Sequence, residues 1–93
     1  MRFKFDKQKS IRLKHNPKRG IGFEEVQEIW MHPYYEDYRS DNPDQFRVIG
    51  WVHGKLFSCI FEVREDTDGE YYHLVTLWQS TFQEVKLYEK NIL

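Results

Sequence analysis

Three runs of alternating apolar and polar residues fill the second half of the chain, with turn-forming residues between them. Phe46–His53 and Lys55–Arg64 meet at His53-Gly54, a pair that suits a tight hairpin turn. Asp66-Thr67-Asp68-Gly69 leads from the second run to the third, Tyr71–Trp78. Period-two alternation of this length indicates β-strands, and short connections make consecutive strands antiparallel neighbours. The pattern therefore predicts a β-meander at the centre of the fold.

Helix signals precede this meander. Residues 3–5 alternate phenylalanine with lysine, which favours a short strand at the very start. Asp6 is a good N-cap for a first helix from Lys7 to Lys14. We expect Ile11 to be its inward residue, with weaker support from Leu13.

A second helix is predicted to open at residues 21–26 and to close at Met31-His32-Pro33, since the residue before a proline avoids the helical region. Tyr34–Arg39 is predicted to be a short aromatic edge strand. The apolar residues at helical spacing in this second helix are Phe23, Val26, Ile29 and Trp30.

A last helix is predicted from about Thr81 to Lys90. Its capping box is either Thr81 with Glu84 or Ser80 with Gln83. Its apolar stripe is formed by Phe82, Val85, Tyr88 and Ile92. The whole reads as an α+β fold in a single domain over residues 1–93, with two N-terminal helices, an antiparallel meander sheet of three or four strands, and a C-terminal helix.

Composition narrows the class of protein. A lone Cys59 rules out an intramolecular disulfide, and the four histidines have no metal-ligand spacing, so neither a metal nor another cofactor is expected. No apolar run reaches the roughly 20 residues of a membrane span. The start of the chain lacks an apolar signal core, which favours the cytoplasm.

Charge is unevenly distributed along the chain. Residues 1–19 hold eight basic residues against one acidic residue, whereas residues 20–93 hold six basic and fourteen acidic residues. A basic segment of this density can contact phosphates, which makes its first helix a candidate RNA-binding element. Alternatively, the segment is a solvated helix face, or an arm answered by the acidic body of the same chain. The candidate RNA-binding residues of that helix are Lys7, Lys9, Arg12 and Lys14.

The turn lengths predict which strand residues lie opposite one another. A two-residue turn at His53-Gly54 places Arg47 opposite Ile60, and the Asp66–Gly69 turn places Glu62 opposite His73. The same register puts Phe57 opposite Trp78. One sheet face then collects the core residues Phe46, Val48, Val52, Phe57, Cys59, Phe61, Val63, Tyr72, Leu74 and Trp78.

The opposite face gathers polar residues toward one end, and these carry the candidate chemistry. A histidine near its ordinary pKa can move a proton, a glutamate can orient it, and arginines can hold a phosphate. An aromatic ring there, or at Trp51, can stack on a base. The alternative interpretation is a cross-strand salt-bridge cluster on a wet sheet face. The candidate catalytic residues are Arg47, Glu62, Arg64, Tyr71 and His73.

Short motifs along nearly the whole chain resemble the BrnT family of bacterial type II toxins, which are similar in fold to RelE-type ribonucleases. The matching stretches are Phe5-Asp6-x-x-Lys9, Lys14-His15, Gly20-Ile21-x-Phe23-Glu24-Glu25, Pro33, Gln45-Phe46-Arg47-x-Ile49-Gly50, Leu74-Val75-Thr76, and Thr81-x-x-Glu84 with Tyr88. The chain departs from the family at His73 and Trp78, where the family has arginines, and at Gln79, where it has lysine.

The resemblance implies a small metal-independent ribonuclease that cleaves RNA and is neutralised by a cognate antitoxin, as a homodimer or as a heterotetramer with that antitoxin. A second hypothesis keeps the scaffold without the activity: a protein-binding module. Its contact residues would be the aromatic side chains Tyr34, Tyr35, Tyr38 and Trp51.

Overall fold

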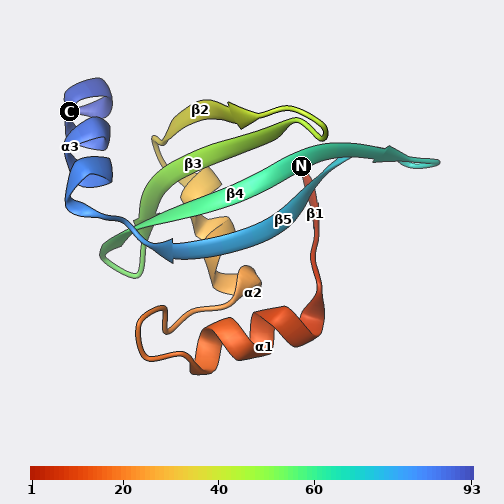
Figure 1. Ribbon diagram of the computed structural model, residues 1–93, viewed down its shortest axis with the longest axis horizontal. Helices are drawn as coiled ribbons and strands as arrows, with labels where there is room; N and C mark the ends of the chain where they lie inside the picture. Colours follow the sequence, from red (N-terminus) through yellow and green to blue (C-terminus); the bar gives the residue numbers. More distant parts are fainter.

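A five-stranded mixed sheet runs through the middle of the molecule, and helices from both ends of the chain pack near it (Figure 1). The computed structural model describes residues 1–93. The combination of this sheet with helices from both ends of the chain confirms the predicted α+β class. The elements in chain order are β1 (Arg2–Lys4), α1 (Lys7–His15), α2 (Phe23–Val26), the 3₁₀-helix η1 (Gln27–Met31), β2 (Tyr35–Ser40), β3 (Gln45–Val52), β4 (Lys55–Asp66), β5 (Gly69–Gln79) and α3 (Phe82–Ile92).

The strands lie in the order β1-β5-β4-β3-β2, with β1 parallel to β5 and every other pair antiparallel. The prediction of three or four antiparallel strands is therefore wrong in strand number and in the direction of one pair. A three-residue strand such as β1 is too short for its partner or direction to follow from alternation. The predicted edge strand at residues 34–39 is present as β2.

The central register follows the turns, as predicted. Arg47 lies opposite Ile60 and Glu62 lies opposite His73. The β3–β4 turn uses His53 and Gly54, both with positive φ (50° and 79°), the backbone conformation that a tight hairpin of this kind requires.

One irregularity in β5 breaks the predicted pattern. Ile60 pairs with Thr76 whereas the next residue, Phe61, pairs with Leu74, so Val75 has no partner on β4. This is a β-bulge, which inserts one extra residue into one strand of an antiparallel pair.

The bulge moves every later residue of β5 to the other face. Phe57 pairs with Gln79 instead of Trp78, so that prediction is wrong. Leu77 turns into the core, and Trp78 turns to the opposite face of the sheet. Val63 is also misassigned, because it is exposed, near the outer end of the β4–β5 hairpin.

Most of the predicted core face is correct. Its residues pack against α1, α2 and η1, which close this side of the sheet. The buried cluster consists of Leu13, Ile21, Phe23, Val26, Ile29, Val48, Val52, Phe57, Cys59, Phe61, Leu74 and Leu77. Phe46 and Tyr72 join it as half-buried residues.

Helix α1 begins as predicted, because the Asp6 side chain accepts a hydrogen bond from the Lys9 amide at 3.1 Å. Its inward residue is Leu13, whereas Ile11 is 51% exposed, so the expectation for Ile11 is wrong. Two residues along a helix turn by about 200°, so only one of the pair can face the core. The first turn also buries Ser10, whose hydroxyl accepts a hydrogen bond from the Phe23 amide.

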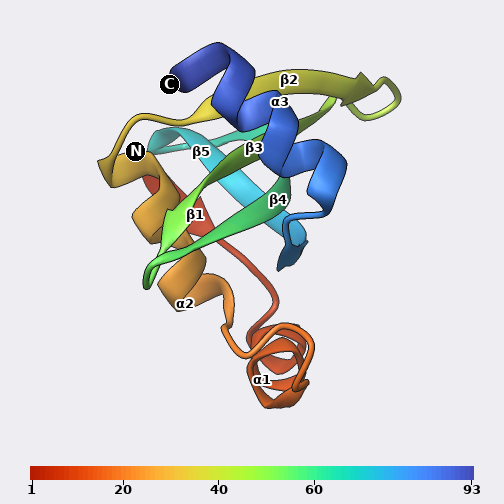
Figure 2. The same ribbon diagram turned by 90° about the vertical axis from the view of Figure 1, so that its left-hand side faces the viewer.

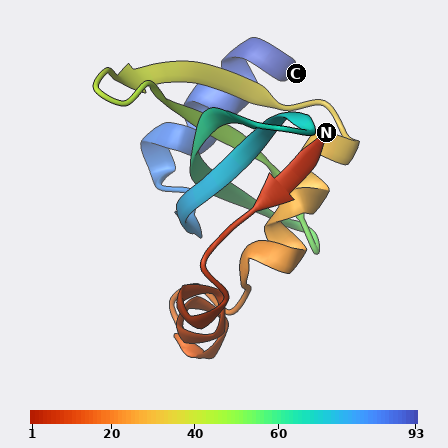
Figure 3. The ribbon, with the colours of Figure 1, turned by 90° about the vertical axis from the view of Figure 1, so that its right-hand side faces the viewer.

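Helix α3 lies across the other face of the sheet, the face on which the candidate catalytic residues were predicted. Figures 2 and 3 show α3 and the α2–η1 segment on opposite sides of the strands. Tyr88 packs with Ile49 and Leu56, and the Thr81–Glu84 capping box is confirmed. Phe82 is 75% exposed, so its place in the apolar stripe is wrong. None of the helices has the length and apolar character needed to span a membrane.

Candidate functional site

The half of the sheet face beyond α3 carries a cluster that we call the polar patch: Glu62, Arg64, Tyr71 and His73. Glu62 pairs with His73 across β4 and β5, and Arg64 pairs with Tyr71, so all four side chains share one face. The structure therefore brings together four of the five residues predicted to be catalytic.

Glu62 is the anchor of the polar patch. Its carboxylate accepts two hydrogen bonds from Arg64, at 2.6 and 3.0 Å, and one from Gln45 at 2.7 Å. Burial by itself raises the pKa of Glu62, but these hydrogen bonds outweigh it and leave the pKa below its usual value. Glu62 is therefore ionised near neutral pH, and it positions the guanidinium of Arg64.

His73 is the group in the patch that can accept a proton. Burial lowers the pKa of His73, the positive charges of Arg64 and Lys9 lower it further, and the nearby Glu62 only partly compensates. The imidazole is consequently neutral at pH 7. A neutral imidazole beside fixed positive charge is suited to general-base chemistry on an anionic substrate.

Cations from β1 extend the polar patch. Lys4 is the register partner of His73 on β5, and its ammonium lies 4.5 Å from the centre of the Tyr71 ring. Arg2 lies 5.5 Å from the same ring. Both cations also bind Asp66, at 2.8 Å for Arg2 and 2.6 Å for Lys4. Two cations of the basic N-terminal segment are thus neutralised by ion pairs with an acidic residue of the same chain.

Arg47 does not join the patch, although it lies on the same face. Its guanidinium binds Asp37 through two nitrogens, at 3.1 and 2.5 Å, and Glu84 at 3.4 Å. The side chain is only 15% exposed. Arg47 is therefore a structural ion-pair partner that ties β2, β3 and α3 together.

The predicted RNA-binding residues are dispersed. Trp51 packs edge-on against Tyr88 of α3. It lies six residues along β3, about 20 Å, from Gln45, which is the β3 residue that hydrogen-bonds Glu62 of the polar patch. On α1, Lys14 pairs with Glu25 at 3.2 Å, whereas Lys7 and Arg12 are exposed without an ion-pair partner. Of these residues only Lys9 is near enough to His73 for its charge to affect the histidine.

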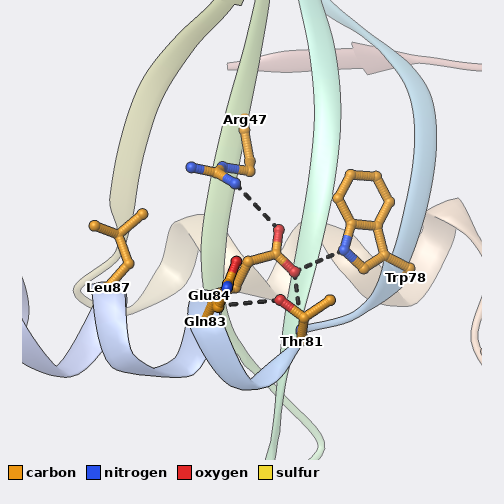
Figure 4. A pocket seen from close by; sticks show the side chains of 6 residues that line it. All are labelled: Arg47, Trp78, Thr81, Gln83, Glu84 and Leu87. Carbon is orange, nitrogen blue, oxygen red and sulfur yellow. Dashed lines mark hydrogen bonds and ion pairs between the residues drawn. The ribbon is translucent and has the colours of Figure 1, made fainter.

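A hollow that the sequence does not reveal lies beside the patch, under the first turn of α3 (Figure 4). We call it the α3 hollow; its volume is about 460 Å³. Its position depends on the β5 bulge, because only the bulge turns Trp78 to this face. In the sequence, the only signal for its location is the capping box, because Thr81 and Glu84 both line the hollow. Its lining residues are Arg47, Trp78, Thr81, Gln83, Glu84 and Leu87.

Glu84 organises the α3 hollow. One of its oxygens accepts hydrogen bonds from the Trp78 indole and the Thr81 amide, both at 2.8 Å, and the other binds Arg47. Burial raises the pKa of Glu84, but hydrogen bonds, led by the Thr81 amide, more than offset this and hold the pKa below its usual value. The carboxylate is thus ionised although its side chain is only 7% exposed.

No protein-family model matches the sequence, and no curated protein matches it either. What the site can do follows from its own groups. A neutral His73, the carboxylate of Glu62 and the guanidinium of Arg64 can together bind an anion and remove a proton next to it. No three or more His, Cys, Asp or Glu side chains come together in a cluster that could hold a metal ion.

Proposed function

We propose that this chain is a metal-independent endoribonuclease of the BrnT-like toxin type, with the polar patch as its active site. The observation that carries the proposal is the position of His73, a half-buried histidine that lies opposite Glu62 on the neighbouring strand and shares its sheet face with Arg64. The short sequence motifs that resemble the BrnT family also favour it.

The chemistry needs only side chains of the patch. His73 takes the proton from a ribose 2′-hydroxyl, and the resulting oxygen attacks the adjacent phosphorus. The bond from phosphorus to the 5′ oxygen breaks, water protonates that oxygen, and the products are a 2′,3′-cyclic phosphate and a 5′-hydroxyl end. Glu62 stabilises the imidazolium that forms on His73.

Arg64 of the patch holds the phosphate. It is fixed by Glu62 and leaves part of its guanidinium to a ligand, whereas Lys4 is already bound to Asp66. Tyr71 offers a ring on which a neighbouring base can stack. Arg47 is assigned no contact with the substrate, because Asp37 and Glu84 already occupy its guanidinium.

A purified-protein assay tests the assignment. The wild type should cleave single-stranded RNA in the presence of EDTA and produce cyclic-phosphate ends. His73→Ala should lower the rate by roughly 10²–10⁴-fold, the usual contribution of a general base. His32→Ala, which removes an exposed histidine outside the patch, is the matched control and should retain full activity. Equal rates for the wild type and His73→Ala would rule out the site.

The toxin role makes a cellular prediction. Expression in the cytoplasm should arrest growth, His73→Ala should relieve the arrest, and co-expression of a cognate antitoxin should relieve it for the wild type. An arrest that His73→Ala leaves intact would show that any toxicity comes from another part of the protein.

A second candidate function is the protein-binding module, and β2 favours it. This strand is at the edge of the sheet, so one side of its backbone has no strand partner. Tyr38 is 54% exposed on it, and Tyr34, just before the strand, is also exposed. A partner strand could pair there and pack against these rings. A stable complex that Tyr38→Lys disrupts, with no RNA cleavage by the wild type, would select this function.

A further inference from the structure

The α3 hollow has no role in the cleavage step, yet it lies on the same sheet face as His73. Its volume of about 460 Å³ is within the range of small-molecule sites, about 300–1,000 Å³. A site of this size beside a reaction centre can hold a part of the substrate that does not react.

The charges of the hollow favour an uncharged group. Arg47 is the only cation among its lining residues, and Asp37 and Glu84 already bind it. A phosphate entering here would meet the ionised Glu84 without a free cation to bind. The phosphates of a nucleic acid therefore belong at the polar patch, and the hollow suits a neutral part of the ligand.

The walls favour a flat ring. Trp78 and Leu87 stand on opposite sides of Glu84 in Figure 4, and both are apolar. The hydrogen bond from the Trp78 indole to Glu84 fixes the orientation of the ring. A preset aromatic ring is a stacking platform for a base, because stacking needs no adjustment of the protein.

The distance to His73 fits a polynucleotide. Trp78 pairs with Ser58 and His73 pairs with Glu62, so four residues of β4, about 14 Å, separate the two pairs. A strand of RNA with one base in the hollow can reach His73 with the phosphodiester one or two nucleotides along.

We infer that the α3 hollow is a base-binding subsite, in which one unpaired nucleobase of the RNA substrate stacks on Trp78. The choice of RNA as the ligand rests on the proposed function, whereas the preference for a neutral planar ring rests on the hollow alone. Glu84 accepts hydrogen bonds and cannot donate them while ionised. Every RNA base has an N–H that can donate to it, either the amino group of cytosine, adenine or guanine or the N3–H of uracil, so the carboxylate can bind the edge of any base.

Binding to uncleavable RNA tests the subsite apart from catalysis. Tetranucleotides of 2′-O-methylcytidine and 2′-O-methyluridine lack the attacking hydroxyl, and the indole N–H signals of the three tryptophans report binding by NMR. Both ligands should shift the Trp78 signal. Gln83→Phe, which fills the hollow from an exposed position, should weaken cytidine binding roughly tenfold or more, equivalent to about 1.4 kcal/mol of lost stacking.

Glu89→Phe is the matched control, because it adds the same ring at an exposed position of α3 that does not line the hollow. Trp78→Leu provides a second test that removes the platform itself. Unchanged affinity in both Gln83→Phe and Trp78→Leu would overturn the subsite, even if His73-dependent cleavage is found. Base binding that these variants abolish, in a wild type that cleaves no RNA, would support the subsite and refute the nuclease.

Discussion

The substitution Arg47→Ala tests whether Arg47 has a structural or a catalytic role. Arg47 makes two hydrogen bonds to Asp37 and one to Glu84, and its side chain is only 15% exposed. Removing one partner of a buried ion pair costs about 3–5 kcal/mol. Asp37 stays partly open to water, and Glu84 keeps two other hydrogen-bond donors. We therefore expect a smaller loss in the free energy of unfolding, about 2–3 kcal/mol.

Urea denaturation followed by far-UV circular dichroism measures this loss directly. In a domain of this length it corresponds to a fall in Tm of roughly 10–20 °C. Arg39→Ala is the matched control, since Arg39 is an exposed arginine of β2 without an ion pair, and it should stay within about 0.5 kcal/mol of the wild type.

Two results would contradict the structural assignment. A stability loss below about 0.5 kcal/mol for Arg47→Ala would mean that the network behaves like an exposed salt bridge. A fall in RNA cleavage much larger than the loss of folded protein would mean that Arg47 acts on the substrate. A double-mutant cycle with Asp37→Ala isolates the pair, and its coupling energy should reach about 1 kcal/mol or more.

Three further predictions concern stability. The pKa of His73 is lowered in the folded protein, so at a pH just below the usual value of 6.5 the unfolded chain binds more protons than the folded one. The free energy of unfolding should therefore decrease as the pH falls through that window. His73→Asn should remove this part of the pH dependence, measured by urea titrations at several pH values. Ser10→Ala should cost about 1–3 kcal/mol in chemical denaturation, because the Phe23 amide loses its acceptor inside the protein. Gly50→Ala would place a methyl 2.8 Å from Ile29 Cγ2 and should lower stability by about 1–3 kcal/mol. Ile29→Ala should therefore cost less in the Gly50→Ala background than in the wild type.

Local signals were enough to predict the centre of the fold. Turn length decides hairpin register, so the opposition of Glu62 and His73 follows from residues close in sequence. The Thr81–Glu84 capping box is likewise a local pattern, and it marks the start of α3 correctly. The four residues of the polar patch could be grouped for this reason alone.

What could not be predicted depends on contacts between distant segments. The pairing of β1 with β5 joins residues more than sixty positions apart, and nothing local specifies it. The same holds for Arg47, because its position and residue type are compatible with phosphate binding until Asp37 and Glu84 are seen to occupy it. Helix α3 could be predicted as a helix, but the face of the sheet that it covers could not.

The bulge at Val75 connects the two parts of the site. His73 and Trp78 are five residues apart, and in a regular strand an odd separation places side chains on opposite faces. The unpaired Val75 shifts the alternation by one, so His73 and Trp78 share the face that carries Glu62. Bulges are frequent next to active sites, where they redirect a side chain. An extra residue that brings a candidate base and a candidate stacking ring onto one surface is a stronger argument for a functional face than either residue alone.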